Sequence, residues 1–257
     1  MNIYQHFRPE ERGFIDTIID WKGYVEASYS PKLTDFLDPR EQQIAKTIIG
    51  EHGDVLISFF GGVENSERKR AILAPDYFQA TNDEFKISLY EIEYPSKFVT
   101  IEHRQVLGSL MSLGLKRSKF GDILFHGSTV QFFATMEIRD YIEMELKSIG
   151  RAQVRLKEIP LENALMVDEN WQELSITSSS LRLDTLVSSI YHISRQKAQV
   201  LISQGLVKVN WTIVESVSFE CGEGDTLSVR GYGRVKISAI EGKTKKDKWR
   251  ILAKLLK

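Results

Sequence analysis

The side chains of this sequence that are best suited to chemistry are the arginines and lysines of its last third. Residues 181–257 contain 14 Lys and Arg against 7 Asp and Glu, whereas residues 1–180 contain 20 against 28. The chain therefore joins a basic segment of charge +7 to an acidic remainder of charge −8, although its net charge is only −1. A basic segment on an acidic body indicates a polyanion as partner. An ordinary solvated surface is the alternative.

Two short helices and a small sheet are expected to position these basic side chains. A first helix follows residue 181, with its apolar residues on one side. Ser194 is a suitable N-cap for a second helix over Arg195–Gln204. Lys243–Lys257 is predicted to be a flexible or amphipathic tail that docks through its apolar residues. The strands predicted after the helices cover Val207–Asn210, Leu227–Arg230 and Arg234–Ile240.

The residues before this segment predict two further domains and a linker. The first 75 residues are expected to be mainly helical, with Asp38 capping a helix and Asp54–Phe60 forming a buried strand. Asp168–Ser180 is polar and ends in Thr-Ser-Ser-Ser, which is typical of a linker.

Residues 76–165 show the element order β-α-β-β-α-β, which predicts a ferredoxin-like fold. Many unrelated proteins share this topology, including RNA-recognition modules that stack bases on aromatic residues of the open sheet face. The aromatic residues that could stack bases here are Tyr90, Tyr94, Phe132 and Phe133. Because the glycine-aromatic signature of such modules is missing, core packing is the preferred interpretation for the two phenylalanines.

Several sequence runs resemble known families. The run LRLDTLVSSIYHISRQKAQVLISQGLVKVN, followed by GDTLSVRGYGRVKI, resembles an S4 RNA-binding domain over about 60 residues. GGVENSERKRAILAP (61–75) and EHRQVLGSLMSLGLKRSKFGDI (102–123) are similar to YlmH-type proteins, which are bacterial, cytosolic and ribosome-associated. The resemblance implies an α+β chain of three small domains. Their predicted bounds are 1–75 (helical or mixed), 76–165 (ferredoxin-like, RRM-like), a linker over 166–180, and 181–257 (S4 domain with a basic tail).

The resemblance to S4 domains also implies which side chains contact RNA. In these domains, basic groups on the paired helices and the adjoining loop face the backbone of folded RNA, where arginine can donate two hydrogen bonds to one phosphate. Arg182 could instead form a structural ion pair with Asp184 or Asp225. The matching positions in this sequence are Arg182, Arg195, Lys197, Lys208, Arg230, Arg234 and Lys236.

One position departs from the S4 pattern. Trp211 stands where the turn after Val209-Asn210 usually carries glycine, and tryptophan tolerates positive φ poorly. We therefore expect a different turn or local strain. The indole could stack on an RNA base or cover the apolar side of the hairpin. Further secondary RNA contacts are expected at Lys116, Arg117 and Lys119, in a basic loop suited to phosphate.

Enzymatic interpretations find little support in the sequence. The Arg-Leu-Asp run at residue 182 opens a helix, and the glycine-rich loop of a methyltransferase is missing. The histidines show no metal spacing, and a single cysteine, Cys221, excludes a disulfide framework. We expect no cofactor, no metal and no catalysis, and a monomer. A catalytic site of unfamiliar type in residues 1–160 is the weakest alternative, and a deep pocket would revive it.

The expected function is binding of structured RNA: ribosomal RNA and tRNA on the large ribosomal subunit, during rescue or quality control of stalled translation. The alternative is a protein-interaction adaptor in cell-division or envelope processes. The N-terminus lacks the apolar region of a secretory signal, and no stretch reaches the length of a membrane span. A cytoplasmic location without membrane contact is therefore expected.

Overall fold

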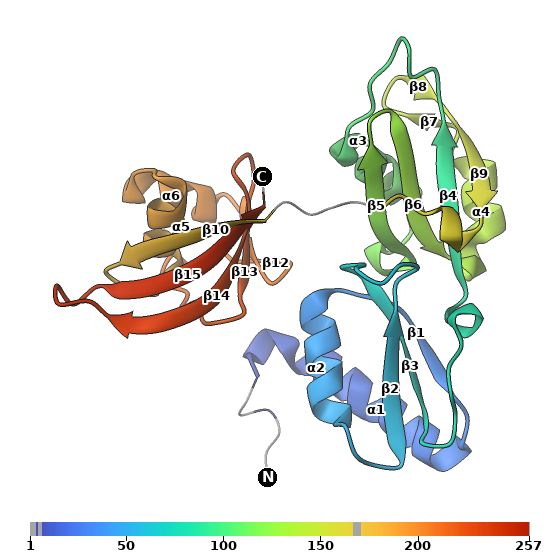
Figure 1. The fold of residues 1–257 in the computed structure, drawn as a ribbon, viewed down its shortest axis with the longest axis horizontal. Helices are drawn as coiled ribbons and strands as arrows, with labels where there is room; N and C mark the ends of the chain where they lie inside the picture. The colour runs from blue at the N-terminus through green and yellow to red at the C-terminus, as the bar shows by residue number, and fades with distance from the viewer. Residues whose placement is uncertain (1–3, 5–6, 167–170, 257) are drawn as a thin grey trace. The chain divides into compact units, whose positions relative to one another are not determined.

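The computed structural model of the chain describes residues 4, 7–166 and 171–256. It divides into two compact units, Met1–Val167 and Asp168–Lys257 (Figure 1). No helix of the described residues is long and apolar enough to cross a membrane.

The first part of unit 1 is a small sheet covered by helices. Asp38 caps α2 as predicted: its side chain accepts from the Glu41 backbone N–H, and the Glu41 carboxylate accepts from the Asp38 N–H. Strands β1 and β3 were not expected from the sequence; β3 begins inside a basic run, which hid it. With these strands, this part contains both helices and a sheet rather than mainly helices. The sheet has the antiparallel order β1-β3-β2. The elements are η2 (Pro9–Glu11), α1 (Arg12–Ser28), β1 (Lys32–Leu37), α2 (Pro39–Ile49), β2 (Val55–Phe60) and β3 (Lys69–Pro75).

The second part of unit 1 has the predicted ferredoxin-like topology. Its sheet has the antiparallel order β5-β6-β4-β9, as the split βαβ pattern requires. Helices α3 and α4 pack on one face of this sheet. Its elements are η3 (Asn82–Phe85), β4 (Ile87–Glu93), α3 (His103–Ser112), η4 (Arg117–Lys119), β5 (Phe120–His126), β6 (Thr129–Thr135), η5 (Met136–Ile138), α4 (Arg139–Glu145), β7 (Ser148–Ile149), β8 (Ala152–Gln153), β9 (Arg155–Ile159) and η6 (Leu161–Asn163).

The aromatic residues of the ferredoxin-like sheet are structural. Tyr90 and Phe132 are fully buried under the helices, with ring centroids 5.4 Å apart. Phe133 points to the other face, is also fully buried, and packs against Phe36 of β1. Core packing of both phenylalanines is therefore confirmed. Tyr94 is half-buried and donates to the carbonyl of Ser128 (2.8 Å).

Polar contacts reinforce the junction between the two parts of unit 1. Arg70 is 2% exposed and donates to the Thr34 carbonyl (2.7 Å), the Lys86 carbonyl (2.8 Å) and the Glu137 carboxylate (2.7 Å). Asp122 accepts from the backbone N–H groups of Glu67 (2.6 Å) and Arg68 (3.1 Å), and burial raises its pKa to about 6. The two sequence runs that resemble YlmH-type proteins therefore meet at this junction.

Unit 2 consists of an extended antiparallel sheet with α5 and α6 packed on one face (Figure 1). The strand order is β10-β15-β14-β13-β11-β12. The core contains the predicted apolar side of α5, namely Leu183, Leu186, Val187 and Ile190. Its elements are β10 (Trp171–Ser178), α5 (Leu183–Tyr191), α6 (Arg195–Ser203), β11 (Val207–Val209), β12 (Thr212–Ile213), β13 (Thr226–Val229), β14 (Gly233–Lys243) and β15 (Trp249–Leu256).

Two segments differ from the sequence prediction. Most of the predicted linker is strand β10, which pairs with β15 from Trp171 to Ser178; residues 167–170 lie outside the described part. The predicted tail over Lys243–Lys257 is not a flexible appendage, because its residues 249–256 form β15, between β10 and β14; residue 257 is not described. Alternate residues Ile251, Ala253 and Leu255 are buried, a period of two that marks a half-buried strand.

We expect Arg70→Met to destabilise unit 1 by about 2–3 kcal/mol, because it leaves two carbonyls and a carboxylate at the junction without their donor. Hydrogen exchange in peptides covering β3 would measure this as roughly 30-fold or greater acceleration. The matched control is Arg104→Met. Arg104 is 82% exposed in a surface ion pair, so its replacement should change stability by less than about 0.5 kcal/mol. Equal exchange in the two variants would contradict the structural role of Arg70.

Candidate nucleic-acid interface

A buried carboxylate organises the start of helix α5. The backbone N–H of Leu183 donates to the Phe219 carbonyl (2.8 Å) and that of Asp184 to the Val217 carbonyl (3.3 Å). These bonds satisfy N–H groups that a helix start leaves without an intrahelical partner. They also fix Asp184 inside the unit, where its side chain is 0% exposed.

Asp184 holds both of the arginines predicted to contact RNA. It accepts from Nε of Arg182 (3.2 Å), Nε of Arg195 (2.9 Å) and the side-chain amide of Gln199 (2.9 Å). Burial alone would raise the pKa of Asp184, but the hydrogen bonds from Arg182, Gln199 and Arg195 outweigh it and hold this pKa well below its ordinary value. The carboxylate is therefore ionised at neutral pH and orients both guanidinium groups.

The paired arginines keep part of their hydrogen-bonding capacity for a ligand. The Arg182 and Arg195 side chains are 36% and 55% exposed. Within the described part of the chain, the terminal nitrogens of Arg195 have no hydrogen-bond acceptor. Two guanidinium groups against one carboxylate leave an excess positive charge at this surface. We call Arg182, Arg195 and Gln199 the helix-end surface; its geometry suits a phosphate group.

A second group of predicted residues lies on the opposite face of the sheet. Val207, Val209, Val235 and Ile237 point into the core beneath the helices, so the residues between them point away from it. Opposite Lys236 stands Lys254 of β15, and like charges directly opposite are destabilising. The Glu173 carboxylate of β10, 3.9 Å from Lys254 Nζ, offsets part of this repulsion, and a bound anion would relieve the rest. The sheet surface consists of Lys208, Arg234, Lys236 and Lys254, with Trp211 at its edge.

Lys197 and Arg230 belong to neither surface. Lys197 Nζ lies 5.5 Å from the ring centroid of Tyr232, which itself packs against Tyr191 at 5.5 Å. Arg230 is exposed beside this group, in the turn between β13 and β14. The predicted basic residues therefore form three groups rather than one continuous patch.

The hairpin turn at Trp211 keeps the geometry that glycine would favour. Asn210 (φ 48°) and Trp211 (φ 66°) both have positive φ, so the expectation of a different turn is wrong and the alternative, local strain, holds. Asn210 imposes this conformation: its side chain donates to Asp225 (2.7 Å) and accepts from the Thr226 N–H (2.9 Å). The half-exposed indole lies 5.8 Å from the Arg234 guanidinium, on the sheet surface.

The expected secondary contacts in the loop before β5 have mostly intramolecular partners. Arg117 donates to the carbonyls of Phe120 (2.5 Å) and Gly121 (3.2 Å), and burial lowers its pKa to about 10. Lys119 forms an ion pair with Asp35 (2.6 Å). Lys116 is exposed. Of the three, Lys116 is the one best placed to meet a ligand.

Sequence reasoning missed three contributors to these surfaces. Gln199 follows Arg195 by four residues, a spacing that places both on one side of a helix and could have been noticed. Tyr232, whose ring lies beside Lys197, was not singled out. Lys254 was assigned to the tail, although the alternation in residues 249–256 predicts a strand.

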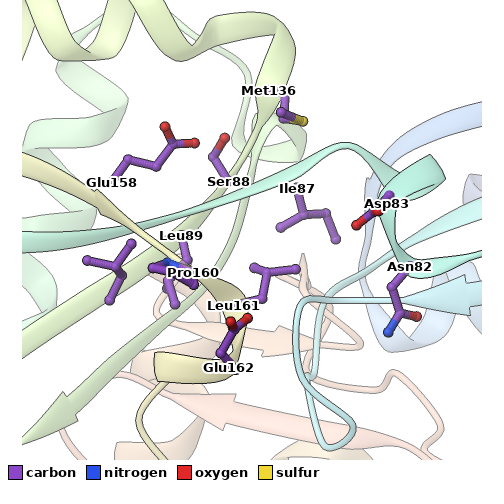
Figure 2. Close-up of a pocket in the computed structure, with 11 residues that line it drawn as sticks. Asn82, Asp83, Ile87, Ser88, Leu89, Met136, Glu158, Pro160, Leu161 and Glu162 are labelled. Carbon is purple, nitrogen blue, oxygen red and sulfur yellow. The ribbon is translucent and has the colours of Figure 1, made fainter.

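A pocket of about 510 Å³ opens beside β4 and β9 of unit 1 (Figure 2). Its carboxylates come from Asp83, Glu158 and Glu162, and Glu158 is paired with Arg139. The lining contains no histidine, cysteine or lysine, and Ser88 contributes its hydroxyl. We base no proposal on this pocket, because no contact between Ser88 and one of these carboxylates accompanies it. Among the described residues, no group of His, Cys, Asp and Glu side chains could hold a metal ion.

Comparison with known domains first defines the class of unit 2. An S4 domain model matches residues 181–227, which include both helices, the strained hairpin and the residues around Asp184. The family model of the YlmH N-terminal domain matches residues 10–78, and a YlmH domain model named for RNA binding matches residues 80–163. Unit 2 is therefore an S4 domain extended by strands β10, β14 and β15.

Full-length comparison then identifies the family. The chain is 47% identical over 250 residues to the ribosome-associated protein quality control protein P2 of Bacillus subtilis (strain 168), covering 97% of each chain. A solved structure, the cell division protein ylmH from Streptococcus pneumoniae, is 37% identical with a TM-score of 0.55 and covers 64% of this chain and 100% of that one. This chain belongs to the YlmH family.

The role of Asp184 can be tested with Asp184→Asn, which we expect to destabilise unit 2 by about 2 kcal/mol at neutral pH, because it weakens charge-assisted hydrogen bonds. The lowered pKa means that the carboxylate stabilises the fold fully above its unfolded-state pKa of about 3.9, and less as the pH falls below it. Urea unfolding followed by tryptophan fluorescence should show wild type and variant converging in acid. If the difference in unfolding free energy between wild type and variant stays constant down to a pH of about 3, Asp184 does not stabilise the fold as an ionised carboxylate.

The strain at Trp211 predicts an order of stability. Trp211→Gly should be more stable than Trp211→Ala by about 1 kcal/mol, because both lose the ring but only glycine tolerates the positive φ. Both variants should bind RNA more weakly if the indole stacks on a base, a contact of about 1–3 kcal/mol. Thermal unfolding and fluorescence anisotropy with a labelled RNA hairpin would measure the two effects. Equal stability of the two variants would show that the turn carries no strain.

Proposed function

We propose that this protein binds structured RNA through its S4 domain without catalysing a reaction, in the cytoplasm and without a cofactor. The RNA would be ribosomal RNA on the large subunit together with tRNA, during rescue or quality control of stalled translation. The observation that carries the proposal is the arginine pair held by Asp184, which presents a fixed, partly solvated cationic surface. The name of the Bacillus subtilis relative supports the ribosomal setting.

The mechanism we infer is positional. Arginine side chains lose conformational entropy when they bind phosphate, and Asp184 reduces this cost because it already holds both guanidinium groups in place. Phosphate contacts of this kind fix orientation and carry little sequence information. Selectivity would therefore come from the shape of the folded RNA, read by the helix-end and sheet surfaces together.

Co-sedimentation with ribosomal subunits across a salt series tests the proposal. The wild-type protein should sediment with the large subunit, with an affinity that falls by orders of magnitude between about 50 and 200 mM salt. Arg182→Gln/Arg195→Gln should strongly weaken sedimentation, because it removes both positive charges but leaves amide donors for the buried Asp184. The matched control Lys22→Gln/Lys46→Gln in α1 and α2 should leave sedimentation unchanged. Wild-type protein that stays in the supernatant at low salt would exclude the ribosomal assignment.

A second candidate is the protein-interaction adaptor. The name of the Streptococcus pneumoniae structure, a cell division protein, is the observation that favours it. The same glutamine variants separate the two functions. An adaptor that acts through unit 1 would keep its protein partner when Arg182 and Arg195 are replaced by glutamine, whereas an RNA-dependent association would be weakened.

A further inference from the structure

The middle domain cannot use the usual RNA-binding face of its fold. RNA-recognition modules bind RNA on the sheet face opposite the helices. Here Ile87, Leu89 and Phe133 on that face are buried against Phe36 and Ile72 of the first sheet. Further along the face, the side chain of Gln131 bonds to the backbone of Asn163 and Leu165 (3.3 and 2.8 Å), so the segment after β9 also crosses it. Any RNA contact by this domain must therefore lie elsewhere.

The register of the strands identifies the end of the domain that remains accessible. The first sheet covers the beginning of β4 and the end of β6. The opposite end is formed by the loop after β4, the turn between β5 and β6, the hairpin β7–β8 and the first residue of β9 (Figure 1). Contacts join these pieces: Tyr94 bonds to the β5–β6 turn, and Gly150 lies close to Gln105 of α3.

Basic and aromatic side chains gather at this end. We call it the distal patch and define it as Lys97, Phe98, Arg104, His126, Arg151 and Arg155, all exposed. The exposed carboxylates beside it are Glu93, opposite Arg155 on the sheet, and Glu102, paired with Arg104 at 2.7 Å. Four permanent positive charges thus face two negative ones. This local excess of positive charge contrasts with the net charge of residues 1–180, which is −8.

Phe98 is the most informative residue of the distal patch. It is 88% exposed, although burying a phenylalanine is worth about 1.5–3 kcal/mol. It is not a loose loop residue: the backbone N–H groups of Phe98 and Val99 both donate to the Pro95 carbonyl (2.9 and 3.1 Å). A hydrogen-bonded turn therefore presents the ring to solvent, next to exposed Lys97 in the sequence. An exposed ring with a basic neighbour is an arrangement that single-stranded RNA recognises.

We propose that the distal patch is a second RNA-binding site of this protein, which takes an unpaired nucleotide by stacking its base on Phe98 while Lys97, Arg104 and Arg151 contact the flanking phosphates. The inference rests on the proposed RNA-binding function and deepens it. The S4 domain would read a folded RNA by shape, and the distal patch would hold a single-stranded segment. The family model that covers residues 80–163 and is named for RNA binding is consistent with such a site.

Crosslinking with the full-length protein tests this site directly. The probe is a fluorescent oligouridine that contains 4-thiouridine, which has no folded shape for the S4 domain to read. Irradiation followed by mass spectrometry should place the crosslink in the peptide that contains Phe98. In anisotropy titrations, Phe98→Ala should weaken binding about tenfold, and Arg104→Glu should lower the slope of affinity against salt by about one phosphate contact.

Matched variants control for exposure and charge. Tyr77→Ala removes a 70% exposed aromatic ring, and Lys46→Glu reverses a 63% exposed cation in a surface ion pair. Both should bind oligouridine like the wild type. Unchanged binding by Phe98→Ala, or crosslinks confined to residues 171–256, would overturn the proposal even if the protein still binds ribosomes through Arg182 and Arg195. If the wild type binds neither oligouridine nor ribosomes, the proposed function fails as well.

Discussion

The buried carboxylate of Asp184 is the interaction on which the candidate interface depends. A charge with no solvent exposure is stable only when it is fully paired, and here two arginines and a glutamine surround it. The same contacts that satisfy Asp184 orient the arginines toward solvent. Structural and functional interpretations of Arg182 and Arg195 are therefore compatible, because the ion pairs that stabilise unit 2 also preorganise the surface that we propose for RNA binding.

The S4 domain also contains locally unfavourable features. Hydrogen bonds from the Asn210 side chain to Asp225 and Thr226 fix the hairpin turn, and this turn forces Trp211 into a positive φ that is unfavourable for a tryptophan. Lys236 and Lys254 are another unfavourable pair, since the two like charges stand opposite each other and Glu173 offsets only part of their repulsion. Both lie on the sheet surface. Strain and repulsion kept at one surface are expected where a ligand compensates for them.

The ferredoxin-like domain of unit 1 differs from RNA-recognition modules in the exposure of its sheet. Those modules bind RNA on the open sheet face, but here the first sheet packs on that face and buries it. Buried Arg70 and the carboxylate of Asp122 hold that contact through backbone groups of both parts. The RNA site that we propose on this domain therefore lies at its distal end. The fold alone would have suggested a face that is buried here.

The sequence alone determined the ferredoxin-like order, the core side of α5 and the identity of the basic residues, because hydrophobic periodicity and helix caps are local signals. It did not reveal β10, since a polar edge strand resembles a linker until a partner strand is present. The alternation in β15 was a local signal, but it follows the lysine-rich run of residues 243–248 and was therefore assigned to a tail. The tertiary structure alone decided that Asp184 unites two arginines 13 residues apart and that Lys208 and Arg182 belong to separate surfaces. These outcomes depend on long-range pairing and burial, which no local pattern encodes.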